Sequence, residues 1–156
     1  MDKIKTMSIN WTCKIFEDLS STELYAIMHL RNEVFVVEQN CVYQDADFKD
    51  LHAHHLTAWD DKKLVAYCRL LPAGIAFEKC SIGRVITHPD YRKLGLGKQL
   101  MTLAIENIQQ IFKENCIIIG AQLYLKNFYE SLGFKQISET YLEDGIPHIE
   151  MQRGTA

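Results

Sequence analysis

The sequence predicts one mixed α/β (α+β) domain, built on a central, mostly antiparallel, twisted sheet flanked by helices. Two observations carry this prediction. Short apolar stretches of strand character alternate with stretches of helical periodicity, in the order β-α-β-β-β-α-β-α-β-β. The 156 residues are 47% hydrophobic and contain no linker or internal repeat, so residues 1–156 fit a single domain with a core from about residue 9 to residue 153.

Composition excludes several classes of protein. The net charge is −3 and no cluster of five or more lysines and arginines occurs, so we expect no nucleic-acid partner. No run of 18 apolar residues is present and Met1–Lys5 lacks the apolar segment of a signal peptide, so we expect no membrane insertion and no export. The five scattered cysteines form no Cys-x-x-Cys pair, which predicts free thiols in a reducing cytoplasm.

The first elements are a strand, a helix and an acidic loop. Alternating residues predict a strand over Trp11–Phe16. Ser20 and Glu23 have the spacing of a capping box, which opens an amphipathic helix that we expect to continue to about Val36. Glu38–Ala53 is polar and acidic, and we expect a solvated loop there with at most one helical turn.

A hairpin and another strand follow. His55–Trp59 and Leu64–Leu71 have strand character and flank the turn sequence Asp60–Lys63, so together they predict a β-hairpin. Cys80–Thr87 predicts a further strand. Pro89 ends it, because proline has no N–H to donate to a sheet.

The centre of the chain predicts a long helix and a buried strand. Apolar residues at helical spacing predict a helix over Leu96–Phe112. Cys116–Ala121 is continuously apolar, as in a strand that is covered on both faces. A crossover helix makes this strand parallel to Cys80–Thr87 if the two strands are neighbours.

The C-terminal part predicts a short helix and two strands. Leu123–Leu132 has helical character and ends at Gly133, a residue type that is common just after a helix. We expect strands over Phe134–Tyr141 and Ile146–Arg153, on either side of the turn Glu143–Gly145.

One strand-to-helix junction has the composition of an anion-binding site. Gly95 and Gly97 stand at the start of the long helix, with Arg92, Lys93 and Lys98 close by. Backbone N–H groups in a first helical turn are unpaired and the helix dipole adds positive charge, so a phosphate group is attracted there. Taken alone, the same residues would also fit a plain helix cap.

Two common nucleotide-binding patterns do not match this junction. A P-loop requires glycine where Arg92 stands and serine or threonine where Gln99 stands. A dinucleotide-binding fingerprint requires a third glycine at the position of Leu100. Arg92-x-x-Gly95-x-Gly97 after a strand instead resembles motif A of the GCN5-related N-acetyltransferase (GNAT) superfamily.

Further segments support this resemblance. Phe128–Phe134 is similar to motif B of the superfamily, and it follows motif A by about forty residues with a helix and a strand between them. Gln122 departs from the general pattern, in which many relatives have asparagine, although either amide can meet pantetheine or a backbone group. Similarity to the ElaA-type branch extends over nearly the whole chain, through Val34–Gln39, Gly83–Val85, Ala121–Gln122 and Glu143–His148.

The resemblance implies the GNAT acyl-CoA N-acyltransferase fold, with acetyl-CoA as co-substrate. In the family, the strand before motif A binds the pantetheine arm and the amides of the following loop bind the pyrophosphate. Carried over to this sequence, the residues that bind acetyl-CoA are Val85, Ile86, Thr87, Arg92, Lys93, Leu94, Gly95, Leu96, Gly97, Lys98, Gln122 and Phe128. A backbone N–H of Val85 or Ile86 would stabilise the oxyanion of the reaction.

The resemblance also implies catalytic roles. Tyr129 matches the family's general acid, which protonates the leaving thiolate; alternatively, it packs against CoA and donates a hydrogen bond without transferring a proton. An amine with the pKa of lysine is neutral in only about one molecule in 2,500 at pH 7, so the site must supply a base or recruit the neutral form. We consider Glu38, His55 and His148 as candidate bases. The alternative is a water relay with no dedicated base.

These expectations combine into an N-acetyltransferase that moves an acetyl group directly from acetyl-CoA to an amine in a ternary complex. The acceptor would be a small amine, a peptide or a protein amine, and the acidic residues of Glu38–Asp50 favour a cationic one. The alternative is a non-catalytic acyl-CoA-binding or sensing module on the same fold. Family members are often dimers, so a homodimer is consistent with the resemblance.

Two other features of the sequence could suggest a metal site and a covalent mechanism, but each fits that chemistry poorly. His52, His54 and His55 with Cys41 and nearby aspartates lack the paired spacings of a zinc site, so we expect no metal. Cys41 would be an acyl-accepting nucleophile in a covalent route. No supporting His–Asp arrangement is visible near it, and direct transfer is usual in the family.

Overall fold

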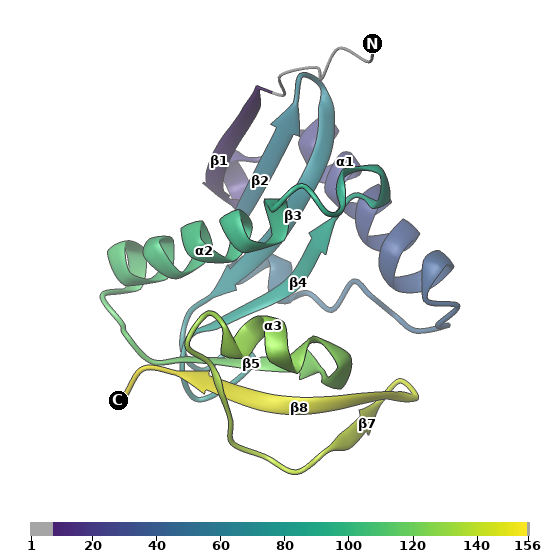
Figure 1. Ribbon diagram of the computed structural model, residues 1–156. Coiled ribbons are helices and arrows are strands. Elements are labelled where there is room, and N and C mark those ends of the chain that lie inside the picture. The colour runs from purple at the N-terminus through teal and green to yellow at the C-terminus, as the bar shows by residue number, and fades with distance from the viewer. Residues whose placement is uncertain (1–7, 156) are drawn as a thin grey trace.

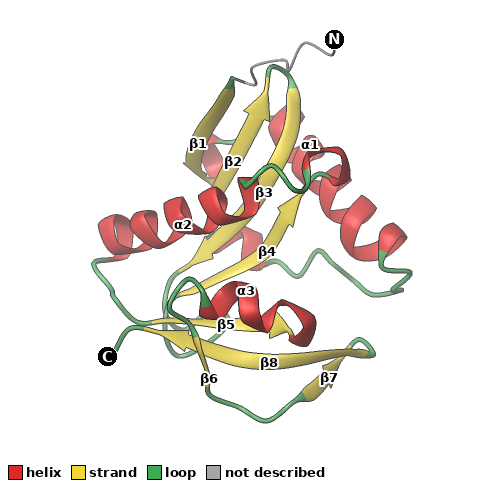
Figure 2. Ribbon diagram, viewed as in Figure 1, coloured by secondary structure: helices red, strands yellow, loops and turns green. Residues whose placement is uncertain are grey.

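Two mainly antiparallel sheets form the fold in the computed structural model, which describes residues 8–155 (Figures 1 and 2). Met1–Lys5, where we see no signal-peptide pattern, lies outside the described residues. The first sheet has the order β1-β2-β3-β4, formed by Ile9–Ile15, His54–Asp60, Lys63–Leu71 and Ser81–Thr87. The second has the order β5-β8-β6 with β7 also on β8, formed by Ile117–Gln122, Lys135–Gln136, Tyr141–Glu143 and Ile146–Arg153.

The two sheets meet where β4 begins beside β5. Cys80 and Ile117 form a parallel bridge, and the Ile118 N–H donates to the Cys80 carbonyl at 2.9 Å. This confirms the parallel relation expected across the crossover helix. Beyond the bridge the two strands diverge, which is visible as the gap between β4 and β5 in Figure 1. A mostly antiparallel mixed α/β fold is therefore confirmed, with the sheet opened at its centre.

β3 is buried along almost its whole length because helices cover both of its faces. Ala66, Cys68 and Leu70 pack in the cluster that includes the α2 residues, whereas Tyr67 packs in the cluster with Ile27 of α1. Figure 1 shows α2 crossing one face of the first sheet and α1 lying on the other side. A strand covered on both faces is mostly apolar, as β3 is apart from Lys63 at its exposed start and Arg69, whose charge is paired with aspartates.

The helix α2, Leu96–Phe112, has the bounds expected from its periodicity. Gly95 precedes it as the N-cap, with a φ of 77° in the left-handed region that glycine adopts without strain. Its buried face is formed by Leu96, Leu100, Met101, Ala104, Ile105 and Ile108.

The first helix differs from the prediction at its C-terminal end. α1 spans Ser21–Arg31 and starts at the expected capping box, in which Ser20 Oγ accepts from the Glu23 N–H at 3.0 Å. From Asn32 to Glu38 the chain continues as a π-helix, with a bond from the Gln39 N–H to the Val34 carbonyl. Such wide turns are rare and often occur at functional sites. The apolar periodicity to Val36 did not reveal this change of helix type.

The C-terminal strands also differ from the prediction in one place. Instead of one strand over Phe134–Tyr141, the chain forms the two short strands β6 and β7, which pair with different parts of β8. The predicted short helix is a 3₁₀ turn, Leu123–Leu125, followed by α3, Lys126–Glu130. The turn between β7 and β8 has φ of 51° at Asp144 and 79° at Gly145. Two residues with positive φ are typical of a type I′ hairpin.

The aspartates of the acidic loop are largely withdrawn from solvent, contrary to our expectation of a solvated loop. Arg31 is fully buried, and its Nε and Nη1 atoms donate to Asp45 and Asp50, each at 2.7 Å. Arg69 binds both carboxylate oxygens of Asp47, at 2.8 and 2.7 Å, and also reaches Asp50 at 3.0 Å. The loop is therefore fixed to the helix and the sheet by neutralised charges, and these aspartates offer little attraction to a cationic acceptor.

The pKa values of two of these aspartates follow from the same contacts. Burial alone would raise the pKa of Asp47, but hydrogen bonds and positive charge from Arg69, with charge from Arg84, hold it well below its ordinary value. Burial would likewise raise the pKa of Asp50, but the hydrogen bonds and positive charge of Arg31 and Arg69 lower it below its ordinary value. Both carboxylates stay charged at neutral pH.

Cys13, Cys41, Cys68, Cys80 and Cys116 are all free thiols, and all except Cys13 are buried. Within residues 8–155, no helix combines the length and the hydrophobicity that crossing a membrane requires.

Candidate active site

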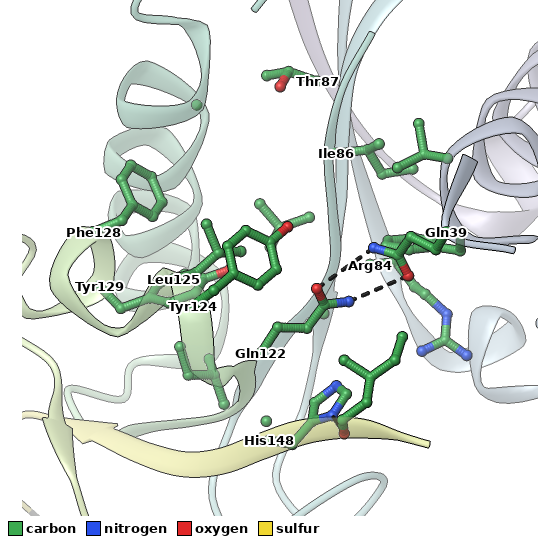
Figure 3. A pocket seen from close by; sticks show the side chains of 18 of the residues that line it. Gln39, Arg84, Ile86, Thr87, Gln122, Tyr124, Leu125, Phe128, Tyr129 and His148 are labelled. Atoms are coloured by element: carbon green, nitrogen blue, oxygen red, sulfur yellow. Dashed lines mark hydrogen bonds between the residues drawn. The ribbon is translucent and has the colours of Figure 1, made fainter. Parts of the chain in front are cut away.

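A cavity of about 940 Å³ opens where β4 and β5 diverge (Figure 3). Its walls come from the end of the π-helix, β4, the loop before α2, the end of β5, α3 and the β7–β8 hairpin. This volume lies in the usual range for small-molecule sites. Segments far apart in the sequence therefore meet around one space.

The β4 wall contains a β-bulge. Gly83 lies opposite Arg69 and Ile86 lies opposite Tyr67, so two residues of β4, Arg84 and Val85, stand against a single residue of β3. Arg84 has a φ of 53°, which is unusual for a residue other than glycine. A bulge leaves backbone groups without partners in the ladder. Val85, Ile86 and Thr87, which the resemblance assigns to the pantetheine arm, all line the cavity at this point.

The loop before α2 forms one end of the cavity. Arg92, Lys93, Gly95, Gly97 and Lys98 line it. A Cβ atom at Gly97 would lie 3.7 Å from the Phe128 ring, and one at Gly95 would meet nothing within 4 Å.

Two predicted members of this loop do not line the cavity. The Leu94 side chain is 52% exposed, and Leu96 packs in the core at the start of α2. Apolar side chains have no reason to face a pyrophosphate, so these residues can contribute only backbone groups.

Positively and negatively charged side chains lie at opposite ends of the cavity. Arg92, Lys93 and Lys98 supply three cations at the α2 end. Glu143 and Asp144 lie at the hairpin end. An anionic group is favoured at the first end and an amine at the second.

Glu38 lies against the cationic end rather than standing free. Its Oε1 atom is 2.7 Å from Nη2 of Arg92, and both side chains are about two-fifths exposed. The next residue, Gln39, reaches across to Gln122 at the end of β5. The end of the π-helix thus contacts two opposite walls of the cavity.

Tyr129 comes from α3 and is 6% exposed at the cavity wall (Figure 3). Its ring packs edge-on against Phe128 and Phe134, at centroid distances of 5.2 and 6.0 Å. Burial raises the pKa of the Tyr129 hydroxyl well above its ordinary value. The hydroxyl is therefore protonated at neutral pH, as a proton donor must be.

His148 faces the same cavity from β8 (Figure 3). Its Nδ1 atom lies 2.7 Å from the Ile146 carbonyl oxygen, which can only accept, so Nδ1 carries the hydrogen. In the neutral ring, Nε2 then has the lone pair of a base. Nε2 lies 3.4 Å from a carboxylate oxygen of Glu143, and the ring stacks on Tyr141.

His55, the third candidate base, is placed elsewhere and the prediction is wrong for it. The residue is 1% exposed and does not line the cavity. Its Nε2 lies 3.0 Å from the Asp50 carbonyl and its Nδ1 lies 2.7 Å from the Tyr67 hydroxyl, so both ring nitrogens are occupied. Burial lowers the pKa of His55 and favours its neutral form. His55 is a hydrogen-bonded core residue.

Several lining residues received no role from the sequence, among them Gln39, Arg84, Tyr124 and Glu143. Some of them lie in the segments that resemble the ElaA-type branch, which is the only signal that could have identified them. The loop histidines and aspartates do not converge: within the described chain, 8–155, no group of three or more His, Cys, Asp or Glu side chains could hold a metal ion.

Comparison with known proteins agrees with the geometry. The profile of the Acetyltransferase (GNAT) domain family matches residues 17–154. ElaA of Escherichia coli is 44% identical over 147 residues, which cover 93% of this chain and 96% of that protein. Its crystal structure superposes with a TM-score of 0.89 at 42% identity, covering 94% of this chain and 100% of the other.

A second crystal structure gives the same result. An acyl-CoA N-acyltransferase from Pseudomonas aeruginosa superposes with a TM-score of 0.88 at 45% identity, covering 93% of this chain and 99% of the other. Family profile, sequence identity over nearly the full length and backbone similarity all agree. The chain therefore belongs to the GNAT acetyltransferase superfamily, in its ElaA-type branch.

Proposed function

We propose that this protein transfers an acetyl group from acetyl-CoA directly to an amine, with both substrates bound in one ternary complex. The observation that carries the proposal is that the same cavity is lined by the cationic loop before α2 and by Tyr129 and His148. The description of the Pseudomonas aeruginosa relative as an acyl-CoA N-acyltransferase supports the class of reaction.

The chain fits an acyl-CoA at the α2 end. Backbone N–H groups of the Arg92–Lys98 loop and the helix dipole would bind the pyrophosphate, with Lys93 and Lys98 adding charge. The bulged backbone of Val85–Thr87 would bind the pantetheine arm, and an N–H of Val85 or Ile86 would stabilise the oxyanion. Phe128, beside Gly97, would pack against the bound molecule.

The proton transfers are assigned to two side chains. As the amine nitrogen attacks the thioester carbonyl carbon, His148 Nε2 accepts the amine proton. The carbon–sulfur bond then breaks, and the Tyr129 hydroxyl donates its proton to the sulfur. The products are the N-acetyl amine and the CoA thiol. Glu38, the other remaining candidate base, is engaged by Arg92 and is not assigned this step.

A covalent route through Cys41 is less well supported. The thiol lines the cavity, but its sulfur lies 3.4 Å from the Asp144 carbonyl and the residue is 9% exposed. We therefore expect intersecting rather than parallel initial-velocity lines, and a Cys41→Ala variant that retains turnover.

The proposal is tested by incubating the protein with acetyl-CoA and each of a panel of amines. The release of the CoA thiol is measured, and the acetylated product is identified by mass spectrometry. We expect acetylated amine and free CoA in equal amounts, and a large loss of kcat in His148→Gln. Binding of acetyl-CoA without turnover of any amine would favour the sensing module instead.

A further inference from the structure

Resting on the proposed function, we infer that Gln39 and Gln122 select the acceptor, and that the acceptor amine stands next to an amide group. An amino-acid amide or the N-terminus of a peptide has this chemistry. The two glutamines are specificity-determining residues in this inference, and the amine itself lies beside His148.

The two glutamines form a reciprocal amide pair across the cavity (Figure 3). Nε2 of Gln39 donates to Oε1 of Gln122 at 3.5 Å, and Nε2 of Gln122 donates to Oε1 of Gln39 at 3.3 Å. Both residues line the cavity, one at the end of the π-helix and one at the end of β5. The resemblance assigns Gln122 to acetyl-CoA binding, but in Figure 3 its side chain extends toward Gln39 and away from Phe128, so we reassign this side chain to the acceptor.

Both hydrogen bonds are long. N–H···O bonds in proteins are most often about 2.9–3.0 Å, so this pair is loosely held and open to replacement. Each side chain offers one donor and one acceptor to the other. A ligand amide offers the same two groups, so it can insert between the glutamines and satisfy both. An ammonium group can only donate, and it would leave a glutamine N–H without a partner.

The charges around the pair are already neutralised. Arg84, which lines the cavity near Gln39, is 2.9 Å from Asp45 and also contacts Asp47. Glu38 is paired with Arg92. The centre of the cavity is thus suited to a neutral group with both hydrogen-bonding functions, and the unpaired negative charge lies farther out on the hairpin.

The spacing of the site matches an amine adjacent to an amide. Gln122 and His148 are direct cross-strand partners on β5 and β8. Cross-strand Cβ atoms are about 4.5–5.5 Å apart. Consecutive Cα atoms of a peptide are about 3.8 Å apart, so an α-amine at His148 would place the first amide of its chain within reach of Gln122.

The acidity of such an amine also suits this site. An α-amine has a pKa of about 7.7–8.0, so roughly a tenth is neutral at pH 7, against about one in 2,500 for a lysine side chain. A site whose base is a single imidazole therefore faces a much smaller free-energy cost in reaching the neutral amine when the acceptor is an α-amine than when it is a lysine side chain.

Matched substrates test the inference. Alaninamide and alanine methyl ester both carry an α-amine beside a carbonyl, but only the amide can also donate a hydrogen bond. With wild-type protein we expect kcat/KM for the amide to exceed that for the ester about 10- to 100-fold. Nα-acetyl-lysine, whose amine is remote from its amide, should be a poorer acceptor than alaninamide.

Variants assign the preference to the pair. Gln39→Met and Gln122→Met should each raise KM for alaninamide and bring the amide and ester toward equal kcat/KM, with the Kd of acetyl-CoA unchanged. Gln44→Met, at another glutamine on the cavity wall, should keep the preference.

The outcomes separate the two levels of the proposal. The inference would be overturned if amide, ester and lysine acceptors were turned over equally well. It would also be overturned if the preference for the amide over the ester survived in both variants. Either result would leave the acetyltransferase proposal standing. A Gln122→Met variant that loses acetyl-CoA binding instead of acceptor KM would also overturn the inference. Absence of turnover with any amine would overturn both.

Discussion

The guanidinium of Arg92 lies 2.7 Å from the carboxylate of Glu38, so the first cation of the loop before α2 is held by the end of the π-helix. Both side chains are partly exposed, and such pairs contribute only about 0.2–1 kcal/mol. The contact is therefore weak enough for a pyrophosphate to displace. It also connects the region proposed for the donor with the segment that carries Gln39.

Removing the Glu38 carboxylate should release Arg92 for the donor. We expect Glu38→Gln to lower the Kd of acetyl-CoA by up to about fivefold, since the competing pair is an exposed one. Isothermal titration calorimetry measures this, and kcat should be retained because His148 is the assigned base. Glu33→Gln, on the same π-helix but facing His29, is the control and should leave the Kd unchanged. A higher Kd of acetyl-CoA in Glu38→Gln would show instead that the Glu38–Arg92 pair helps to bind the donor.

Tyr129→Phe should separate proton donation from packing. The ring keeps its contacts with Phe128 and Phe134, so acetyl-CoA should bind normally while kcat falls about 10²-fold or more. Tyr124→Phe, at an exposed tyrosine on the same cavity, should keep kcat within about twofold. Full turnover by Tyr129→Phe would leave the tyrosine with a packing role alone.

The two glycines of the loop should respond differently to alanine. Gly95 has φ of 77°, so Gly95→Ala should destabilise the fold by about 1–2 kcal/mol and weaken acetyl-CoA binding. Gly97 has ordinary φ inside α2, and a Cβ there would meet only the Phe128 ring at 3.7 Å. Gly97→Ala should therefore change the free energy of unfolding by less than about 1 kcal/mol. Urea unfolding of both variants checks this, and equal losses would contradict it.

The buried charges that fix the acidic loop should dominate its stability. Arg31→Met removes the fully buried cation and leaves Asp50 with Arg69 and Asp45 with Arg84, which should cost up to about 3–5 kcal/mol. Glu130→Gln removes only an exposed pair with Lys126 and should cost less than about 0.5 kcal/mol. A small effect of Arg31→Met in urea unfolding would show that the network adds little to stability.

Acid should weaken the fold in two stages. The pKa of His55 is lowered by burial, so the unfolded chain binds more protons below about pH 6.5 and stability starts to fall there. The pKa values of Asp47 and Asp50 are also lowered, so their contribution is complete above their ordinary value of 3.8 and is lost as the pH falls below it.

Urea titrations from pH 8 to pH 3 follow both stages. In Asp50→Asn, the second stage should be smaller and the stability at pH 7 lower. Stability that rises as the pH falls from 7 to 4 would contradict this assignment.

Most of the fold could be predicted from local patterns. The helix Leu96–Phe112 and the strand Ile146–Arg153 have the bounds expected, because apolar spacing and the Asp144–Gly145 turn mark them directly. The break between β6 and β7 was missed, because it depends on how each piece pairs with β8 and not on its own sequence.

The site was predictable at one end only. Backbone groups at a strand-to-helix junction can bind phosphate, and glycine spacing marks such junctions, so the loop before α2 could be proposed from the sequence and does line the cavity. The other end depends on side chains brought together by tertiary contacts. His55 and His148 look alike in the sequence, and only the structure shows one bonded inside the core and the other at the cavity.

The π-helix Asn32–Glu38 has a consequence for how acceptor choice can change among relatives. A π-helical turn holds about one residue more than an α-helical turn, so substitutions that allow Asn32–Glu38 to wind as an ordinary α-helix would advance every later residue by about one position. Each later side chain would then rotate by about 100°, and Glu38 and Gln39 would leave the cavity together. A change of helix type at constant length, with β4 and the loop before α2 untouched, would alter the acceptor while keeping the donor.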